Sequence, residues 1–199
     1  QGRAKNSNDL TQPAILKMMV MGGEGSIIER LKQLHIVPLS ISYEYDPCDY
    51  LKAREYQLRR DIPFWKKTAE DDLESMLIGI KGFKGHIFYS CAPCIDEWLD
   101  TLDTDLPKNK LFDAIASHID HEIHCNYKLY PVNYIALDMI QDTKAYEEYY
   151  TLADYEKFDA YIAGQIEKIN IENRDDKFLR TCLLTQYAYP AKNYIDASS

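Results

Sequence analysis

Two short segments with strand-like composition constrain the fold of this chain more than any other feature. Residues 36–43 alternate Ile and Val with small or polar residues, and residues 85–90 are apolar and aromatic between turn signals. Both patterns predict strands. After Asp96 the apolar residues recur with helical spacing. The sequence therefore predicts an α/β fold: a partial sheet with flanking helices over residues 1–105, followed by a mainly helical region over residues 106–199.

Capping signals predict the helices of the first half. Ser26 with Glu29 has the capping-box spacing and predicts a helix over 27–34. Thr68 with Asp71 predicts a second helix that stops at Gly82. The apolar residues of that second helix are expected to face the core: Leu73, Met76, Leu77 and Ile80. Further helices are expected at 14–21, 47–60, 108–125, 131–141, 152–173 and 176–187.

Charge and cysteine content exclude several classes of protein. A net charge of -9 disfavours a broad nucleic-acid surface, which needs clustered Lys and Arg. An odd number of widely spaced cysteines argues against a disulfide scaffold and favours a reducing cytoplasm. No apolar run approaches the length of a bilayer span. We therefore expect a cytoplasmic protein, with any membrane contact peripheral and on the inner face of the cytoplasmic membrane.

The N-terminal residues predict a small anion site. Gly2 lies between polar residues, and a glycine lets the backbone approach a ligand closely. Arg3 and Lys5 beside it supply cations for a phosphate. The sequence contains neither a phosphate-cradling P-loop nor a GxSxG elbow, so nucleotide hydrolysis and serine-esterase chemistry have no support.

Three blocks in order resemble the glycerolipid acyltransferase family of the 1-acylglycerol-3-phosphate type. Gln-Gly-Arg at residues 1–3 is similar to the family's Glu-Gly-Thr-Arg turn. Val-Pro-Leu-Ser-Ile-Ser-Tyr at residues 37–43 resembles its Val-Pro-x-x-Ile-x-Tyr strand, and residues 81–95 resemble the strand that ends in Gly-x-Pro-Ile. The resemblance implies an acyltransferase-type sheet. It also implies that Gly2, Arg3 and Lys5 hold the anionic head of the acceptor and that Pro38 shapes the acceptor pocket.

The same resemblance implies a partial enzyme. In the family, a His followed five positions later by an Asp lies upstream of the Gly-Arg turn and acts as general base. No His of this chain has an Asp at that spacing, Gln1 replaces the family's Glu, and the Thr of the turn is absent. The implied activity moves a fatty acyl group from acyl-ACP or acyl-CoA to a hydroxyl of a glycerolipid or amino-acid lipid, without a cofactor. This chain alone is expected to be inactive, with no catalytic residue.

A different class of function is suggested by the tyrosines. Eight of the 16 tyrosines lie between Tyr127 and Tyr161. Because tyrosine has an apolar body and a polar tip, such a run indicates either half-buried helical faces or a contact surface. The alternative to the enzyme is therefore a non-catalytic binding or interaction module that uses this helical half.

Three other constellations are interpreted as structural. His118, His121, Glu122 and His124 have helical spacing, but no further metal ligand is placed by the sequence, so no metal is predicted. Cys91 and Cys94 have redox spacing, yet the intervening proline and the acids that follow oppose a thiolate. Glu44 and Asp46 are interpreted as solvated or capping acids.

Overall fold

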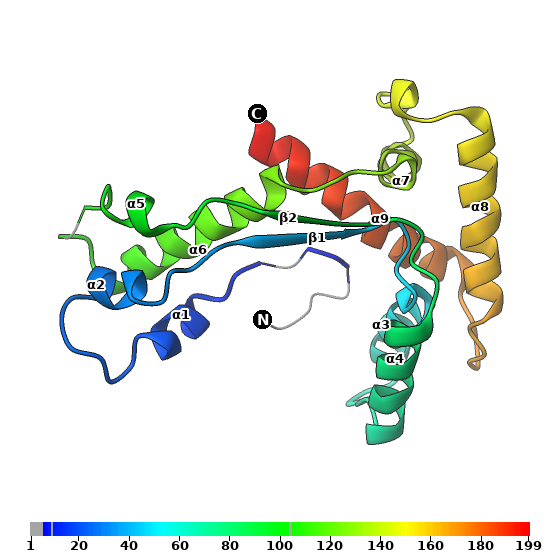
Figure 1. The fold of residues 1–199 in the computed structure, drawn as a ribbon. Coiled ribbons are helices and arrows are strands. Elements are labelled where there is room, and N and C mark those ends of the chain that lie inside the picture. The colour runs from blue at the N-terminus through cyan, green and yellow to red at the C-terminus, as the bar shows by residue number, and fades with distance from the viewer. Residues whose placement is uncertain (1–5, 9, 104) are drawn as a thin grey trace.

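A pair of five-residue strands links two groups of helices in this protein. A computed structural model describes residues 6–8, 10–103 and 105–199. In Figure 1 the strands cross the middle of the molecule, with α1, α2 and α5 toward one end and α3, α4 and α8 toward the other. In chain order the elements are α1 (Pro13–Met19), α2 (Ile27–Lys32), β1 (Leu39–Tyr43), α3 (Asp49–Asp61), α4 (Ala69–Lys81), β2 (Ile87–Cys91), α5 (Asp96–Leu99), α6 (Lys108–Cys125), α7 (Pro131–Gln141), the 3-10 helix η1 (Glu147–Tyr149), α8 (Leu152–Glu167) and α9 (Asp176–Ser198).

The described sheet contains β1 and β2, which are antiparallel. Leu39 lies opposite Cys91, and Tyr43 lies opposite Ile87. Helices hold 59% of the chain, so the predicted α/β class is confirmed only as a mainly helical fold with a small two-stranded sheet. The first strand begins later than predicted, directly after Pro38, a residue that has no N–H to donate to a ladder.

Local capping chemistry sets the starts of several helices. At α2, Ser26 N donates to Glu29 Oε2 at 2.7 Å and Glu29 N donates to Ser26 Oγ at 3.2 Å, as predicted. The predicted capping box of Thr68 and Asp71 is present at α4. Helices α6 and α7 have the predicted bounds. The local sequence was therefore enough to predict a helix start where the capping residues lie within the first turn of that helix.

The ends of α8 and α9 differ from the predictions. Helix α8 stops at Glu167, and in the segment that follows Arg174 Nη1 donates to the carbonyl of Ile169 at 3.4 Å. Helix α9 runs past Tyr187 to the end of the chain, although Pro190 lies inside it. A proline removes one helical hydrogen bond, but the surrounding turns pack and keep the helix continuous.

Two hydrophobic clusters form the core. One joins α3, α7, α8 and α9 around Ile135, Phe158 and Leu183. The other joins α1, α2, α5 and α6 around Leu31 and Ile115. Each buried side chain of this size contributes about 1.5–3 kcal/mol relative to exposure. Both clusters combine elements from either side of residue 105, and the division of the chain at that point stays a prediction.

The prediction that α4 buries its apolar residues is wrong. Leu73, Met76 and Ile80 are 68%, 64% and 76% exposed, and no α4 residue is buried. The helix is held from its polar side, where Arg54 Nη2 pairs with Asp71 Oδ1 at 2.6 Å. Helical spacing therefore predicted the helix but not the side that contacts the rest of the molecule.

Candidate functional site

The strand pair presents an apolar face to the outside of the molecule. Opposed residues of an antiparallel pair point to the same side of a sheet. We define the sheet face as the six residues of one such set: Leu39, Ile41, Tyr43, Ile87, Tyr89 and Cys91. All six are exposed, and the five large ones lie between 41% and 59% exposed. Flanking helices were predicted for this sheet, but this face is not buried beneath them.

Serines of β1 occupy the opposite, inward side. Ser40 is buried, and its Oγ donates to the carbonyl of Ile123 at 2.7 Å. The Oγ of Ser42 accepts a hydrogen bond from Lys128 N at 3.0 Å. These bonds attach β1 to the C-terminal end of α6 and to the segment that follows. An antiparallel sheet with one solvated side normally turns its apolar residues inward, so this orientation is inverted.

The structure describes one of the four predicted substrate-binding residues. Gly2, Arg3 and Lys5 lie outside the described residues. Pro38 is buried directly before β1, and its carbonyl accepts a hydrogen bond from Ala92 N at 2.9 Å. Pro38 therefore lies at one end of the strand pair, and its role at an acceptor pocket stays a prediction.

The first described residues lie against α6 and α9. Asn193 Nδ2 donates to Asn8 Oδ1 at 3.1 Å, and Thr11 N donates to Asp120 Oδ1 at 2.8 Å. Because α6 also holds β1, the segment that follows Lys5 contacts the same helix as the strand after Pro38. Helix α6 is thus a common support for Thr11 and for β1.

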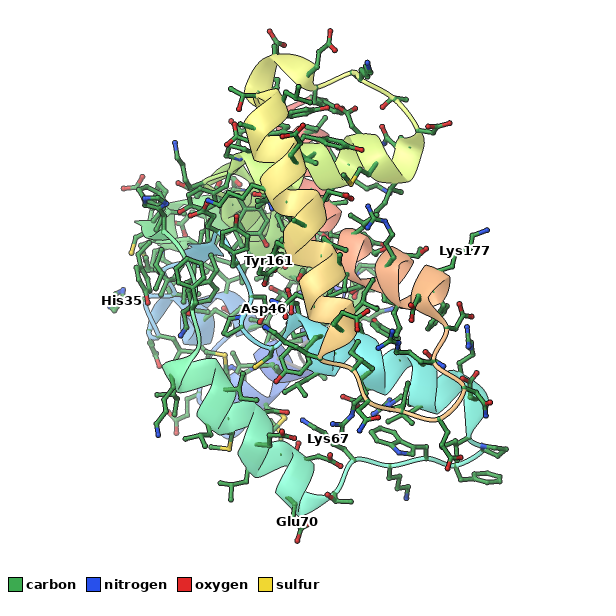
Figure 2. The ribbon with its side chains drawn as sticks, turned by 90° about the vertical axis from the view of Figure 1, so that its right-hand side faces the viewer. His35, Asp46, Lys67, Glu70, Tyr161 and Lys177 are labelled. Atoms are coloured by element: carbon green, nitrogen blue, oxygen red, sulfur yellow. The ribbon has the colours of Figure 1, made fainter. Side chains whose placement is uncertain are left out.

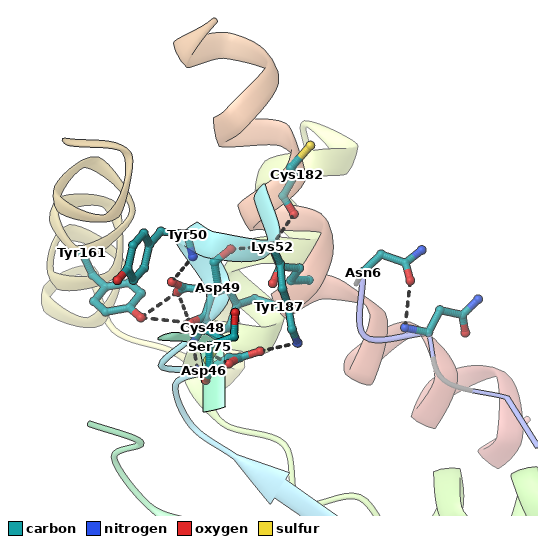
Figure 3. Close-up of polar contacts among 12 residues, drawn as sticks. Asn6, Asp46, Cys48, Asp49, Tyr50, Lys52, Ser75, Tyr161, Cys182 and Tyr187 are labelled. Carbon is teal, nitrogen blue, oxygen red and sulfur yellow. Dashed lines mark hydrogen bonds and ion pairs between the residues drawn. The ribbon is translucent and has the colours of Figure 1, made fainter. Parts of the chain in front are cut away.

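A buried carboxylate network lies where α3 meets α8 and α9, and sequence reasoning missed it. Asp49 Oδ2 accepts hydrogen bonds from Tyr161 Oη at 2.7 Å and from Tyr187 Oη at 2.6 Å (Figure 3). Burial raises the pKa of Asp49 from 3.8 to about 6, whereas the two hydroxyls favour its charged form. The tyrosines follow Asp49 by 112 and 138 residues, so no local pattern could connect them.

A cavity of about 260 Å³ adjoins this network between α3, α4 and α8. Tyr50, Phe83 and Tyr161 supply aromatic walls, and Gln165 and Lys168 contribute polar groups. Lys168 Nζ lies 5.4 Å from the centre of the Tyr50 ring. Figure 2 shows Tyr161 on α8 beside the start of α3, where Asp46 is labelled. Such a lining suits an apolar group that carries a polar end.

The histidines of α6 do not converge on one point. The His118 ring stacks on Trp98 with ring centres 3.8 Å apart, and burial lowers the pKa of His118. His121 lies 3.6 Å from Cys125 Sγ, whereas His124 is buried on α6 and its pKa is lowered by burial. Within residues 6–8, 10–103 and 105–199, the group able to hold a metal lies elsewhere and consists of His35, Cys94 and Asp96.

The remaining candidate groups have separate partners. Glu44 Oε2 lies 2.6 Å from His86 Nδ1, and Asp46 Oδ2 pairs with Lys52 Nζ at 2.5 Å. Asp46 also accepts a hydrogen bond from Cys48 N at 2.8 Å in the turn before α3, as a capping acid does, whereas Glu44 is paired with a histidine and is neither capping nor solvated. Both cysteines of Cys-Ala-Pro-Cys are free thiols; one ends β2 and the other belongs to the cluster of His35, Cys94 and Asp96.

Comparison with models of protein families, with curated proteins and with solved structures finds no match to this chain. In the described ranges, every helix is too short or too polar to cross a bilayer.

Proposed function

We propose that this chain forms the acceptor-binding and C-terminal part of an acyltransferase. The observation that carries the proposal is the exposed sheet face. In an α/β domain both faces of a sheet are covered, because an apolar face must be buried against another layer. Here the described strand pair has an apolar face open to solvent and pairs only β1 with β2. A strand pair of this kind fits a sheet that the rest of an acyltransferase domain would complete.

In this proposal the chain binds and orients the acceptor. Arg3 forms a bidentate contact with a phosphate or a carboxylate, so a glycerolipid and an amino-acid lipid both fit. Gly2 brings backbone N–H groups close to the same anion, and Lys5 adds a second cation. The apolar sheet face, which begins after Pro38, is suited to acyl chains or to the elements that enclose them.

The chemical step belongs to a His-x4-Asp pair outside this chain. The His removes the proton of the acceptor hydroxyl, the oxygen attacks the thioester carbonyl, and the thiol of acyl-CoA or acyl-ACP departs. Holding the acceptor in line lowers the entropic part of the barrier. The chain is thus proposed to supply orientation, with no catalytic residue of its own.

The tyrosines give the interaction-module alternative less support. Tyr161 and Tyr187 bind Asp49 inside the molecule, and Tyr150 Oη donates to the buried Asp138 Oδ2 at 2.9 Å. Tyrosines used for internal packing are not free to form the central contacts of a partner surface.

The test uses the polypeptide extended upstream of Gln1. We expect the extension to contain His-x4-Asp and to support acyl transfer from acyl-CoA or acyl-ACP to a lysophospholipid or an amino-acid lipid. Replacing Arg3 by Ala should raise the acceptor KM by roughly 10- to 100-fold, because a charge-assisted contact contributes about 1.5–3 kcal/mol. The value of kcat should change little, since the contact is made equally in ground and transition states.

Lys110→Ala is the matched control, because it removes an exposed cation from the start of α6. Its KM should equal that of the unmodified enzyme. The proposal fails if the extension lacks the His-x4-Asp pair, or if Arg3→Ala and Lys110→Ala have the same KM.

A further inference from the structure

Three different metal-binding side chains converge beside the end of the strand pair. One ligand atom each from His35, Cys94 and Asp96 lies within 4.8 Å of the other two. His35 Nδ1 is 2.5 Å from Asp96 Oδ2. The second oxygen, Asp96 Oδ1, is buried and has no hydrogen-bond partner in the described part of the chain. Nitrogen, sulfur and carboxylate donors are the set that zinc uses in proteins.

The backbone fixes the positions of these donors. Pairing continues beyond the strands, where Ala92 N donates to the Pro38 carbonyl at 2.9 Å and Ile95 N donates to the Ile36 carbonyl at 3.0 Å. Ile95 is also fully buried in the cluster around α6. The two segments that carry the donors are therefore held by main-chain bonds and core packing, as a preorganised site requires.

Backbone strain and open access both occur at the histidine. His35 has a φ of 47°, a left-handed conformation that costs a non-glycine residue roughly 1–2 kcal/mol. Its side chain is 75% exposed, and Figure 2 shows it at the outline of the molecule. The nearby ammonium of Lys32 is paired with Asp100 at 2.7 Å, which offsets its repulsion of a cation.

We propose that His35, Cys94 and Asp96 bind one zinc ion, with the fourth position open to water. Bonds of about 2.0–2.3 Å place tetrahedral ligands about 3.2–3.8 Å apart, so the ion would separate His35 from Asp96 by roughly 1 Å. The ion replaces their hydrogen bond and gives the carboxylate a strong partner. Cys94 binds as a thiolate and releases its proton to solvent.

This site accounts for features that the sequence left unexplained and is independent of the proposed acyltransferase function. No local sequence pattern connects His35 with Asp96, because they are 61 positions apart. The sequence also left Cys94 without a role once redox chemistry was disfavoured. In the proposed site only the second cysteine of Cys-Ala-Pro-Cys is a ligand, and Cys91 is not.

The test begins with the reduced full chain after treatment with a chelator. Zinc titration should give one bound ion per chain, and bound zinc should protect Cys94 from a thiol reagent. Cobalt(II) serves as a spectroscopic probe, because a thiolate ligand produces a charge-transfer band in the near ultraviolet. Cys94→Ser should remove the band and weaken zinc binding at least about 100-fold, more than the loss of an outer-shell partner.

His35→Gly is the second ligand variant. Glycine adopts a positive φ without strain, so the metal-free variant should be at least as stable as the unmodified chain while zinc affinity falls to a similar degree. This variant decides the question if Cys94→Ser does not fold.

Two control variants test whether the loss of metal binding is specific to the proposed ligands. Cys91→Ser retains the cluster, and His86→Ala removes a histidine that is paired with Glu44 through the same ring nitrogen but is not part of the metal-binding group found among the described residues. Both should bind zinc and cobalt as the unmodified chain does. The proposal is overturned if Cys91→Ser loses the band as fully as Cys94→Ser, if Cys94→Ser or His35→Gly retains full affinity, or if neither ion binds the unmodified chain.

Discussion

Asp49 shows how one side chain can couple three helices and make stability depend on pH. Its carboxylate is fully buried, and its hydrogen bonds come from Tyr161 on α8, Tyr187 on α9 and the N–H of Tyr50 on α3. The nearby charge of Asp46 adds to the burial that raises the pKa of Asp49 to about 6. Because the folded-state pKa lies above the ordinary 3.8, the native state binds the proton more tightly than the unfolded chain between these values.

The contribution of Asp49 to stability is fully present below about pH 4 and is lost as the pH rises through about 6. A difference of about two pKa units corresponds to at most roughly 3 kcal/mol. Relative to Asp49→Asn, the unmodified chain should therefore gain up to about 3 kcal/mol of unfolding free energy between pH 7 and pH 4, as measured by urea denaturation.

Tyr161→Phe provides the complementary measurement. It removes a hydroxyl that favours the charged carboxylate, so the Asp49 transition should move to higher pH. Identical pH profiles for the unmodified chain and Asp49→Asn would show that this carboxyl does not carry the effect.

At the scale of the element, the inverted orientation of β1 can be tested by comparing one substitution on each of its two sides. Ser40→Ala leaves the Ile123 carbonyl without its 2.7 Å partner and should lower the unfolding free energy by about 1–2 kcal/mol. Ile41→Ser, one position away, alters an exposed residue of the sheet face and should change that free energy by no more than about 0.5 kcal/mol. Chemical denaturation of both variants gives the comparison, and the opposite order of costs would contradict the described orientation of β1.

Local signals predicted where elements occur, but not what covers them. Ser26 and Thr68 close their helices with neighbours three residues away, so the sequence contains the whole interaction. The burial of Leu73 depends on which distant segment packs against α4, and the spacing of apolar residues is the same in either case. The Asp49 network and the pairing of His35 with Asp96 were missed for the same reason, because both join residues far apart in the chain.

At the scale of the whole molecule, two packed clusters coexist with a large uncovered apolar surface. The sheet face and the outer side of α4 expose several large side chains, although the core residues of each cluster are buried. Exposed apolar patches of this kind mark sites where another layer or partner packs. A net charge of -9 opposes self-association, so covering by a second copy of the chain is disfavoured electrostatically.

This arrangement predicts how the chain responds when the rest of its proposed domain is present. The chain studied alone should bind an apolar dye such as ANS, because its apolar surface is accessible. Combining Ile41→Ser, Ile80→Ser and Tyr89→Ser should reduce the dye fluorescence by about half or more while changing the unfolding free energy little, since all three residues are exposed. The polypeptide extended upstream of Gln1 should show low dye fluorescence without any substitution, because its added elements would cover the sheet face. Equal fluorescence from the extended and the shorter polypeptide would mean that those elements pack elsewhere, and the exposed sheet face would then no longer support the acyltransferase proposal.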